Sequence, residues 1–267
     1  EVEESVGLSS NVGGIIEKIS DQTASVIVQL PNFFGTVEDF SELCEVARHK
    51  GAISICSTYP MCLGLIKTPG EMGFDIVTGE GQSLGIPLSF GGPYLGFMAV
   101  RQGYMRKMPG RIVGFAKDAK GRDCFTLTLQ TREQHIRRES ATSNICSNET
   151  LCAMAAIVYL SAVGKEGFAK IAKLCHSKAN FLSDKLSEIE NVSIANEGVF
   201  FNEFTINLPC DSSEVVSRMI DKGYSAGFPL GRYYSDRRNQ LLIAVTEKRK
   251  KEQLKSYVAA MEDAIWN

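Results

Sequence analysis

The chain has 267 residues, of which 44% are hydrophobic and 22% are charged, as in ordinary soluble globular proteins. At about 100–200 residues per domain, this length allows one large or two modest domains. The formal net charge of -2 creates no global field that attracts nucleic acid or an anionic membrane, so neither is expected as a partner.

Cysteine usage and the lengths of the apolar runs exclude further classes. The eight cysteines contain no C-x-x-C pair and are accompanied by only three histidines, whereas structural zinc needs four closely spaced ligands, so no metal site is predicted. Single thiols in apolar runs, such as Cys56 and Cys152, indicate buried, reduced cysteines of a cytoplasmic protein. No apolar run approaches the roughly 20 residues that span a bilayer, and no signal peptide is recognised. Because the chain starts at Glu1 rather than Met, we expect an N-terminal part to be absent.

In chain order, the first predicted elements form a β-α-β unit. Residues 24–30 are a short β-branched run, which predicts a strand buried on both faces. A sequence similar to a capping box at residues 36–39 predicts the start of a helix that ends at Gly51, and residues 52–56 predict the next strand. This order predicts a parallel sheet with a right-handed crossover.

Shorter strands are predicted next, at residues 74–77, 95–100, 111–116 and 124–129. The last two are expected to pair as a hairpin around residues 118–121. Ser147 or Asn148 is then expected to cap an apolar helix that runs to about Val163 and breaks at Gly164. An amphipathic helix is predicted from about residue 165 to residue 189.

The pattern changes beyond the long helix. Strand and helix signals alternate over the last 70 or so residues, which predicts a small α+β domain joined to the rest by that helix. The predicted elements are a strand at 199–208, a helix start at 211–214, a strand at 241–245 and a helix start at Thr246.

Residues 131–139 concentrate positive charge next to a strong strand. They include Arg132, His135, Arg137 and Arg138. An exposed, charged helix face explains most such segments. The position between a strong strand and a helix that is expected to be buried slightly favours an interface or an anion site here, because arginine can pair with carboxylate and phosphate groups through two hydrogen bonds.

Two further polar groups have two interpretations each. Thr142, Ser143 and Asn144 precede the apolar helix, where such residues either cap the helix or bind an anion beside its free N–H groups, and spacing does not decide between these roles. Arg232 stands beside aromatic residues and is either part of a surface pair, which is favoured, or a carboxylate ligand. By themselves, these features describe a two-domain α/β protein with an arginine-rich edge and name no reaction.

Several runs along the chain are similar to the α-type subunit of glycine decarboxylase, the P-protein of the glycine cleavage system. The resemblance covers essentially the whole chain and implies that roughly the first two-fifths of the usual subunit is absent. The similar runs are residues 29–35 (QLPNFFG), 69–73 (PGEMG), 79–82 (GEGQ), 85–88 (GIPL), 90–96 (FGGPYLG), 108–114 (MPGRIVG), 129–139 (LQTREQHIRRE), 142–146 (TSNIC), 230–234 (LGRYY) and 245–248 (VTEK).

The resemblance implies an α/β fold, the aspartate-aminotransferase-like fold type I of transferases that depend on pyridoxal phosphate (PLP). This fold has a large domain with a mostly parallel sheet and a small C-terminal α+β domain. Residues 1–164 would then be the C-terminal part of the large domain, and residues 165–267 the linking helix and the small domain.

The resemblance also bears on the cofactor. In the catalytic β-type subunit, PLP is held by the lysine of a His-Lys-Thr motif that precedes Ile-Pro and Gly-Gly-Pro. When the sequences are aligned without a gap on residues 86–87 and 91–93, Gln82 falls at the lysine position and Gly81 at the histidine. A carboxamide nitrogen is not a nucleophilic amine, so Gln82 cannot bind PLP covalently. Tyr59 stands where the family has the carboxylate that faces the pyridine nitrogen, and no catalytic residue is assigned to this chain.

The implied role is that of a supporting subunit in an oxidoreductase of glycine catabolism. A β-type partner would carry PLP, decarboxylate glycine and pass the aminomethyl group to the lipoyl arm of the H-protein, within a heterotetramer of two α-type and two β-type chains. This chain would be inactive alone and would supply one wall of the cleft. Arg232 is a candidate for substrate binding. The candidates for that cleft or the α/β interface are Arg132, His135, Arg137, Arg138, Thr142, Ser143 and Asn144.

Two alternatives stay open. One is a stand-alone PLP enzyme that uses another lysine, such as Lys67. The other is a non-enzymatic scaffold that only binds other proteins.

Overall fold

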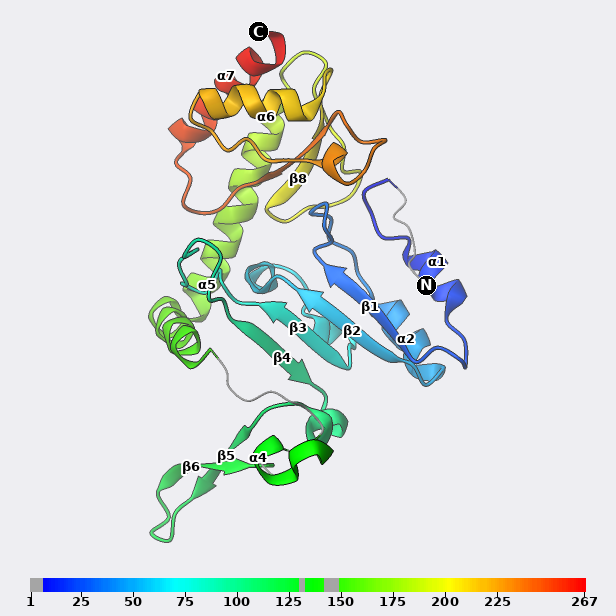
Figure 1. Ribbon diagram of the computed structural model, residues 1–267, viewed down its shortest axis with the longest axis vertical. Coiled ribbons are helices and arrows are strands. Elements are labelled where there is room, and N and C mark those ends of the chain that lie inside the picture. Colours follow the sequence, from blue (N-terminus) through cyan, green and yellow to red (C-terminus); the bar gives the residue numbers. More distant parts are fainter. Residues whose placement is uncertain (1–6, 130–132, 142–148) are drawn as a thin grey trace.

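The computed structural model describes residues 7–129, 133–141 and 149–267. The structure contains two separate four-stranded sheets. One long helix begins beside the first sheet and continues into the part of the molecule that contains the second (Figure 1). A two-stranded hairpin extends from the opposite end of the first sheet (Figure 1).

The first sheet is mostly parallel, as predicted. Its strands lie in chain order, the first three parallel and the fourth antiparallel. Val28, Cys56 and Val77 are direct neighbours across the three parallel strands. The β-branched run lies at the edge of this sheet, where Val28 and Leu30 are buried but Ile27 is 68% exposed, so its predicted burial on both faces is wrong. The strands are β1 (Ser25–Leu30), β2 (Ile53–Thr58), β3 (Ile76–Glu80) and β4 (Gly96–Val100).

Short helices connect these strands. Leu43 and Ala47 of α2 are fully buried in a core shared with Leu30, so one face of this helix packs against the sheet. The capping box predicted at residues 36–39 is wrong, because α2 begins later and the Thr36 hydroxyl instead donates to the carbonyl of Leu8. These helices are α1 (Val12–Lys18), α2 (Ser41–His49), the 3-10 helix η1 (Pro60–Gly64) and α3 (Pro69–Met72).

The segment after β4 leaves the sheet. The 3-10 helix η2 (Gln102–Lys107) leads into the predicted hairpin of β5 (Ile112–Lys117) and β6 (Asp123–Thr128). The turn is closed by Asp118, whose N–H donates to the carbonyl of Arg122. A short helix α4 (Gln134–Arg137) and the 3-10 helix η4 (Arg138–Ser140) follow beside the hairpin (Figure 1).

The long helix is α5 (Thr150–Leu186), and it is kinked at the predicted position. Its first half is largely exposed, with Leu151 79% and Val158 67% exposed and Cys152 only partly buried, so the burial expected there is wrong. Gly164 has φ 64° and ψ -180°, which is not a helical conformation. The N-cap is Glu149, while Ser147 and Asn148, the predicted caps, lie outside the described residues. Of the described part of the chain, only this helix is long and apolar enough to cross a membrane, by length and composition alone. Residues 150–163, before the kink, span about 21 Å at 1.5 Å per residue, less than a hydrocarbon core of about 30 Å.

The second half of α5 packs in the small domain, whose antiparallel sheet has the order β7-β8-β10-β9. Phe204, Ile206 and Leu241 lie in its core without solvent exposure. The helix start at Asp211 is confirmed, since its carboxylate accepts from the Ser213 N–H, but the start at Thr246 is wrong because the last helix begins at residue 251. The elements are β7 (Ser193–Ile194), β8 (Glu203–Asn207), α6 (Ser212–Asp221), β9 (Phe228–Pro229), the 3-10 helix η5 (Leu230–Arg232), β10 (Gln240–Ala244) and α7 (Lys251–Trp266).

The predicted mixed architecture, a mostly parallel sheet followed by a small α+β part, is confirmed. The division of the chain between residues 164 and 165 stays a prediction. Its physical basis is the kink at Gly164, because the helix continues on both sides of it.

Candidate functional site

The carboxyl ends of β1, β2 and β3 lie at one edge of the first sheet, which faces the small domain (Figure 1). Ligands of open α/β sheets bind outside this edge, because the loops that follow parallel strands meet there. Tyr59 directly follows β2, and Gln82 follows β3 with Gly81 between them. The two positions singled out by the sequence therefore belong to the same edge.

Gln82 is half-buried and turned back onto its own loop. Its Nε2 donates to the carbonyl of Ile86 at 2.5 Å, and its backbone N–H donates to Glu80 Oε1 at 2.6 Å. Gly81 is buried, and a Cβ there would lie 3.2 Å from the carbonyl oxygen of Leu95. The loop is thus closely packed around a carboxamide that already has a hydrogen-bond partner, and it presents no amine.

Tyr59 is a neutral phenol at physiological pH. Burial raises its pKa to about 12, an effect partly opposed by the Ser83 hydroxyl and reinforced by the negative charges of Glu203 and Glu247. Its ring lies against Phe201 of the small domain, with 6.2 Å between ring centroids. Tyr59 therefore links the two parts of the molecule and supplies no carboxylate at the end of β2.

Behind Tyr59, the long helix is tied to the loop that follows β10. The Cys175 thiol donates to Glu247 Oε2 at 3.4 Å, and the Glu247 N–H donates to the same sulfur at 3.2 Å. The Lys178 ammonium donates to the carbonyl of Glu247. Burial raises the pKa of the Cys175 thiol to about 11, so it stays protonated and unreactive. No local sequence pattern signals this contact, since the partners are 72 residues apart in the chain.

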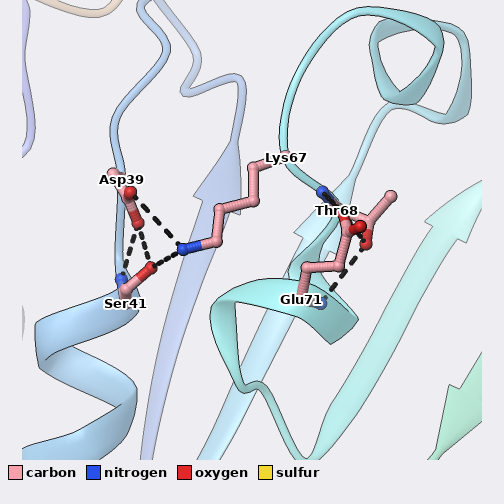
Figure 2. A network of polar contacts seen from close by, with 5 residues as sticks. All are labelled: Asp39, Ser41, Lys67, Thr68 and Glu71. Atoms are coloured by element: carbon pink, nitrogen blue, oxygen red, sulfur yellow. Dashed lines mark hydrogen bonds and ion pairs between the residues drawn. The ribbon is translucent and has the colours of Figure 1, made fainter.

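Lys67, the alternative cofactor lysine, is part of a surface network (Figure 2). Its Nζ donates to the Ser41 hydroxyl at 2.6 Å and lies 3.8 Å from Asp39 Oδ2. Asp39 also accepts from the Ser41 N–H at 2.9 Å, and these hydrogen bonds, chiefly with Ser41, lower its pKa. Thr68 and Glu71 form the capping box of α3 immediately beside it (Figure 2). This arrangement gives Lys67 a structural role at the start of α2.

The arginine-rich segment does not meet the edge that carries Tyr59 and Gln82. His135 and Arg137 lie on α4 and Arg138 opens η4, all three exposed and beside the hairpin, at the other end of the first sheet (Figure 1). Within one chain they therefore do not line the same cleft as Gln82, and an interface remains the prediction for them. The other four candidates, Arg132, Thr142, Ser143 and Asn144, lie outside the described residues.

Arg232 belongs to an aromatic cluster that joins the small domain to the loop after β1. Its guanidinium lies 5.9 Å from the ring centroid of Tyr233. Next to it, Tyr234 lies 5.6 Å from Phe34, and Arg237 covers Phe34 at 5.4 Å. Arg232 is exposed, so its proposed role in binding a substrate carboxylate stays a prediction. The cluster itself went unpredicted because its members come from both ends of the chain.

Comparisons with known proteins agree with one another. The family model described as "Glycine cleavage system P-protein" matches residues 5–261. The curated protein "Probable glycine dehydrogenase (decarboxylating) subunit 1" of Citrifermentans bemidjiense is 49% identical over 259 residues, which are 97% of this chain and 58% of the relative. The chain thus spans less than two thirds of the length of this relative.

Solved structures show the same likeness. A crystal structure of glycine decarboxylase (P-protein) of the glycine cleavage system, in inhibitor-bound form, superposes with a TM-score of 0.87 at 38% identity, over 92% of this chain and 56% of that one. Glutamate decarboxylase of Lactobacillus brevis superposes with a TM-score of 0.68 at 16% identity, over 96% of this chain and 58% of that one, which shows a shared fold. The predicted fold, that of fold type I PLP-dependent enzymes, is confirmed.

The residues at the strand ends do not fit a PLP held covalently by this chain. Attachment needs an amine, and the position after β3 carries a carboxamide that is bonded to the Ile86 carbonyl. An electron-withdrawing pyridinium needs an anionic partner, and the position after β2 carries a phenol with a pKa of about 12. In the described structure, the positions after β2 and β3 therefore carry neither of the two groups that such a cofactor requires.

Proposed function

The chain belongs to the glycine cleavage system P-protein family, and from this premise we propose that it is part of the subunit that carries no PLP and supports a catalytic second subunit. The observation that carries the proposal is the carboxamide of Gln82 at the end of β3. Its hydrogen bond to the Ile86 carbonyl gives it a structural role in place of a nucleophilic one.

The proposed reaction is the decarboxylation of glycine with transfer of the aminomethyl group to the lipoyl arm of the H-protein. PLP, bound by the second subunit, would supply the electron sink for this chemistry. The proposed partners are that subunit, two copies of each chain forming a heterotetramer, and the H-protein, in the cytoplasm. The support is that curated relatives are described as subunit 1 of a glycine dehydrogenase and that this chain lacks an amine at the cofactor position.

The proposed contribution of this chain is rigid support. Tyr59 and Phe201 hold the strand ends against the small domain, and the contacts of Cys175 with Glu247 fix the long helix behind them. Such a scaffold positions the groups of a neighbouring subunit without taking part in bond making, and it keeps water from the region it covers.

Glycine–bicarbonate exchange tests the proposal. The full-length subunit is assayed with H-protein, first alone and then with the second subunit of the same organism. Exchange is expected only in the reconstituted mixture. Borohydride reduction of the mixture in the presence of PLP should label the second subunit and leave this one unlabelled. PLP fixed to this subunit in isolation would contradict the proposal, and the Gln82→Leu variant serves as the matched control for labelling at that position.

A further inference from the structure

The hairpin of β5 and β6, residues 112–128, is called the arm here. Among the described elements it forms a sheet of its own, and each of its strands pairs only with the other. It points away from both four-stranded sheets (Figure 1). A two-stranded hairpin is marginally stable by itself in water, so a projecting one gains from being covered.

The outer face of the arm is apolar. Val113 is directly opposite Leu127, and Phe115 is directly opposite Phe125, so the four side chains form two adjacent rungs on one face. They are 57%, 47%, 66% and 76% exposed, respectively, and the two phenylalanine rings are 5.8 Å apart. The other face carries smaller residues such as Gly114 and Ala116, which are partly covered. The larger apolar residues therefore point to solvent, the reverse of what an isolated hairpin would favour.

The arm and its base are also basic. Residues 101–123 contain seven lysines and arginines and two aspartates, a net charge of +5, although the whole chain has -2. At the tip, Lys117 pairs with Asp123, and Arg122 pairs with Asp118 at 2.7 Å. At the base, exposed Arg106, Lys107 and Arg111 form no ion pair within the described ranges. The apolar rungs are thus bordered by charged groups, the pattern of an interface core with a polar rim.

We propose that the arm docks on the second subunit, with the outer face of Val113, Phe115, Phe125 and Leu127 in an apolar groove that has an acidic rim. The inference rests on the proposed function, because it assigns the arm to the partner that function requires. The first half of α5, with exposed Leu151, Ile157 and Val158, is a second apolar surface outside the arm. Four side chains cover only part of the roughly 800 Å² per partner that a stable interface buries, so the arm is one element of a larger contact.

Charge favours this occupant over a second copy of the same chain. A symmetric contact would place equivalent surfaces together, and two copies of residues 101–123, each with a net charge of +5, would repel each other. An acidic rim on a different chain would instead attract the base of the arm and accelerate association at low salt. A third possibility is that another part of the same polypeptide covers the arm, and the cross-linking experiment distinguishes it from the other two.

The test uses the full-length subunit and its second subunit, both purified. A photo-cross-linking benzophenone side chain is placed at Phe115, and in a matched control at Ile220, which is 61% exposed on α6, far from the arm. Irradiation of the mixture should give a cross-linked band containing the second subunit from position 115 and none from position 220. A band only with another copy of the same chain, or only within it, would overturn the inference.

Binding provides the second measurement. The double variant Phe115→Thr/Phe125→Thr, which keeps residues that favour strands, should weaken the Kd for the second subunit about 30-fold or more, the effect typical of a central aromatic pair. The control Ile220→Gln should leave the Kd unchanged, and the Tm of each isolated variant shows whether it is folded. If the double variant binds with the wild-type Kd, the inference about the arm is overturned but the proposed function is not. If the wild-type subunit does not bind the second subunit at all, both are overturned.

Discussion

The small domain and the arm contain similar apolar residues but use them in opposite ways. In the small domain, Phe204 and Leu241 lie on adjacent strands of one sheet and have no solvent exposure. In the arm, Phe115 and Phe125 also lie on adjacent strands, and most of each ring faces solvent. An alternating apolar pattern therefore predicts which face of a strand will be buried. It does not say whether the chain itself or another molecule buries that face.

Truncation of one phenylalanine in each region should show the largest difference. Phe204→Ala is expected to lower the free energy of unfolding by about 3–5 kcal/mol, because it removes a fully buried ring and leaves a cavity. Phe125→Ala is expected to lower it by less than about 1 kcal/mol in the isolated subunit, because only its contact with Phe115 is lost. Urea unfolding of the two variants measures both values. Equal losses would mean that the arm is buried within the isolated subunit.

The sequence predicted best where local pattern decides the structure. The strand at residues 25–30 follows from its β-branched run, and the turn at Asp118 follows from its turn residues. Gly164 was located because glycine interrupts an otherwise apolar helix. In each case the cause lies within a few residues of the effect.

Prediction failed where partners are distant in the chain. Residues 36–39 have the composition of a helix cap, yet Thr36 contacts Leu8 and the helix starts later. The bond between Cys175 and Glu247 has no local signature at all. Resemblance to a family located Gln82, whereas the geometry of its amide toward Ile86 came only from the structure. The family alignment therefore singled out Gln82 but did not predict the contacts that its side chain makes.

Gly164 lies where the exposed half of α5 meets the half that packs in the small domain. Gly164→Ala should lower the free energy of unfolding by roughly 1–3 kcal/mol, because φ 64° with ψ -180° is a conformation that only glycine adopts easily. No atom stands within 4 Å of the added Cβ, so the effect would come from the backbone. Thermal and urea unfolding measure it, with Ser161→Ala on the same helix as a control that should change stability by less than about 0.5 kcal/mol. A stabilising Gly164→Ala would mean that the kink is not retained.

Alkaline pH should act on the small domain through Tyr257. Its hydroxyl donates to the carbonyl of Ala226 at 2.5 Å, and burial raises its pKa well above the ordinary 10.0. Above pH 10 the unfolded chain loses this proton while the folded chain keeps it, so the wild type should lose roughly 1.4 kcal/mol of stability per pH unit through this group. Below pH 10 both states are protonated and the contribution is constant.

Tyr257→Phe removes that dependence. The variant should be about 1 kcal/mol less stable than the wild type at pH 7, because the Ala226 carbonyl loses its donor, and the difference should shrink and reverse between pH 10 and pH 11. Tyr233→Phe, at a tyrosine that is 72% exposed, is the control and should leave the profile unchanged. Parallel profiles for wild type and Tyr257→Phe would show that the hydroxyl is not buried in solution.

The smallest change in stability and activity is expected for substitution of Lys67, and it tests whether this lysine could hold a cofactor. Lys67→Met removes a contact to Ser41 and an ion pair with Asp39 that are both largely exposed, so stability should fall by no more than about 1 kcal/mol. Exchange activity of the reconstituted enzyme should stay at the wild-type level, because Lys67 lies on the loop before α3, with its side chain against the start of α2, and not at the end of a strand (Figure 2). A variant that keeps its stability but loses activity would identify Lys67 as the reactive amine. A chain with its own cofactor lysine would not need a partner to carry PLP. In that case the carboxamide of Gln82 would no longer be evidence that this chain depends on a second subunit.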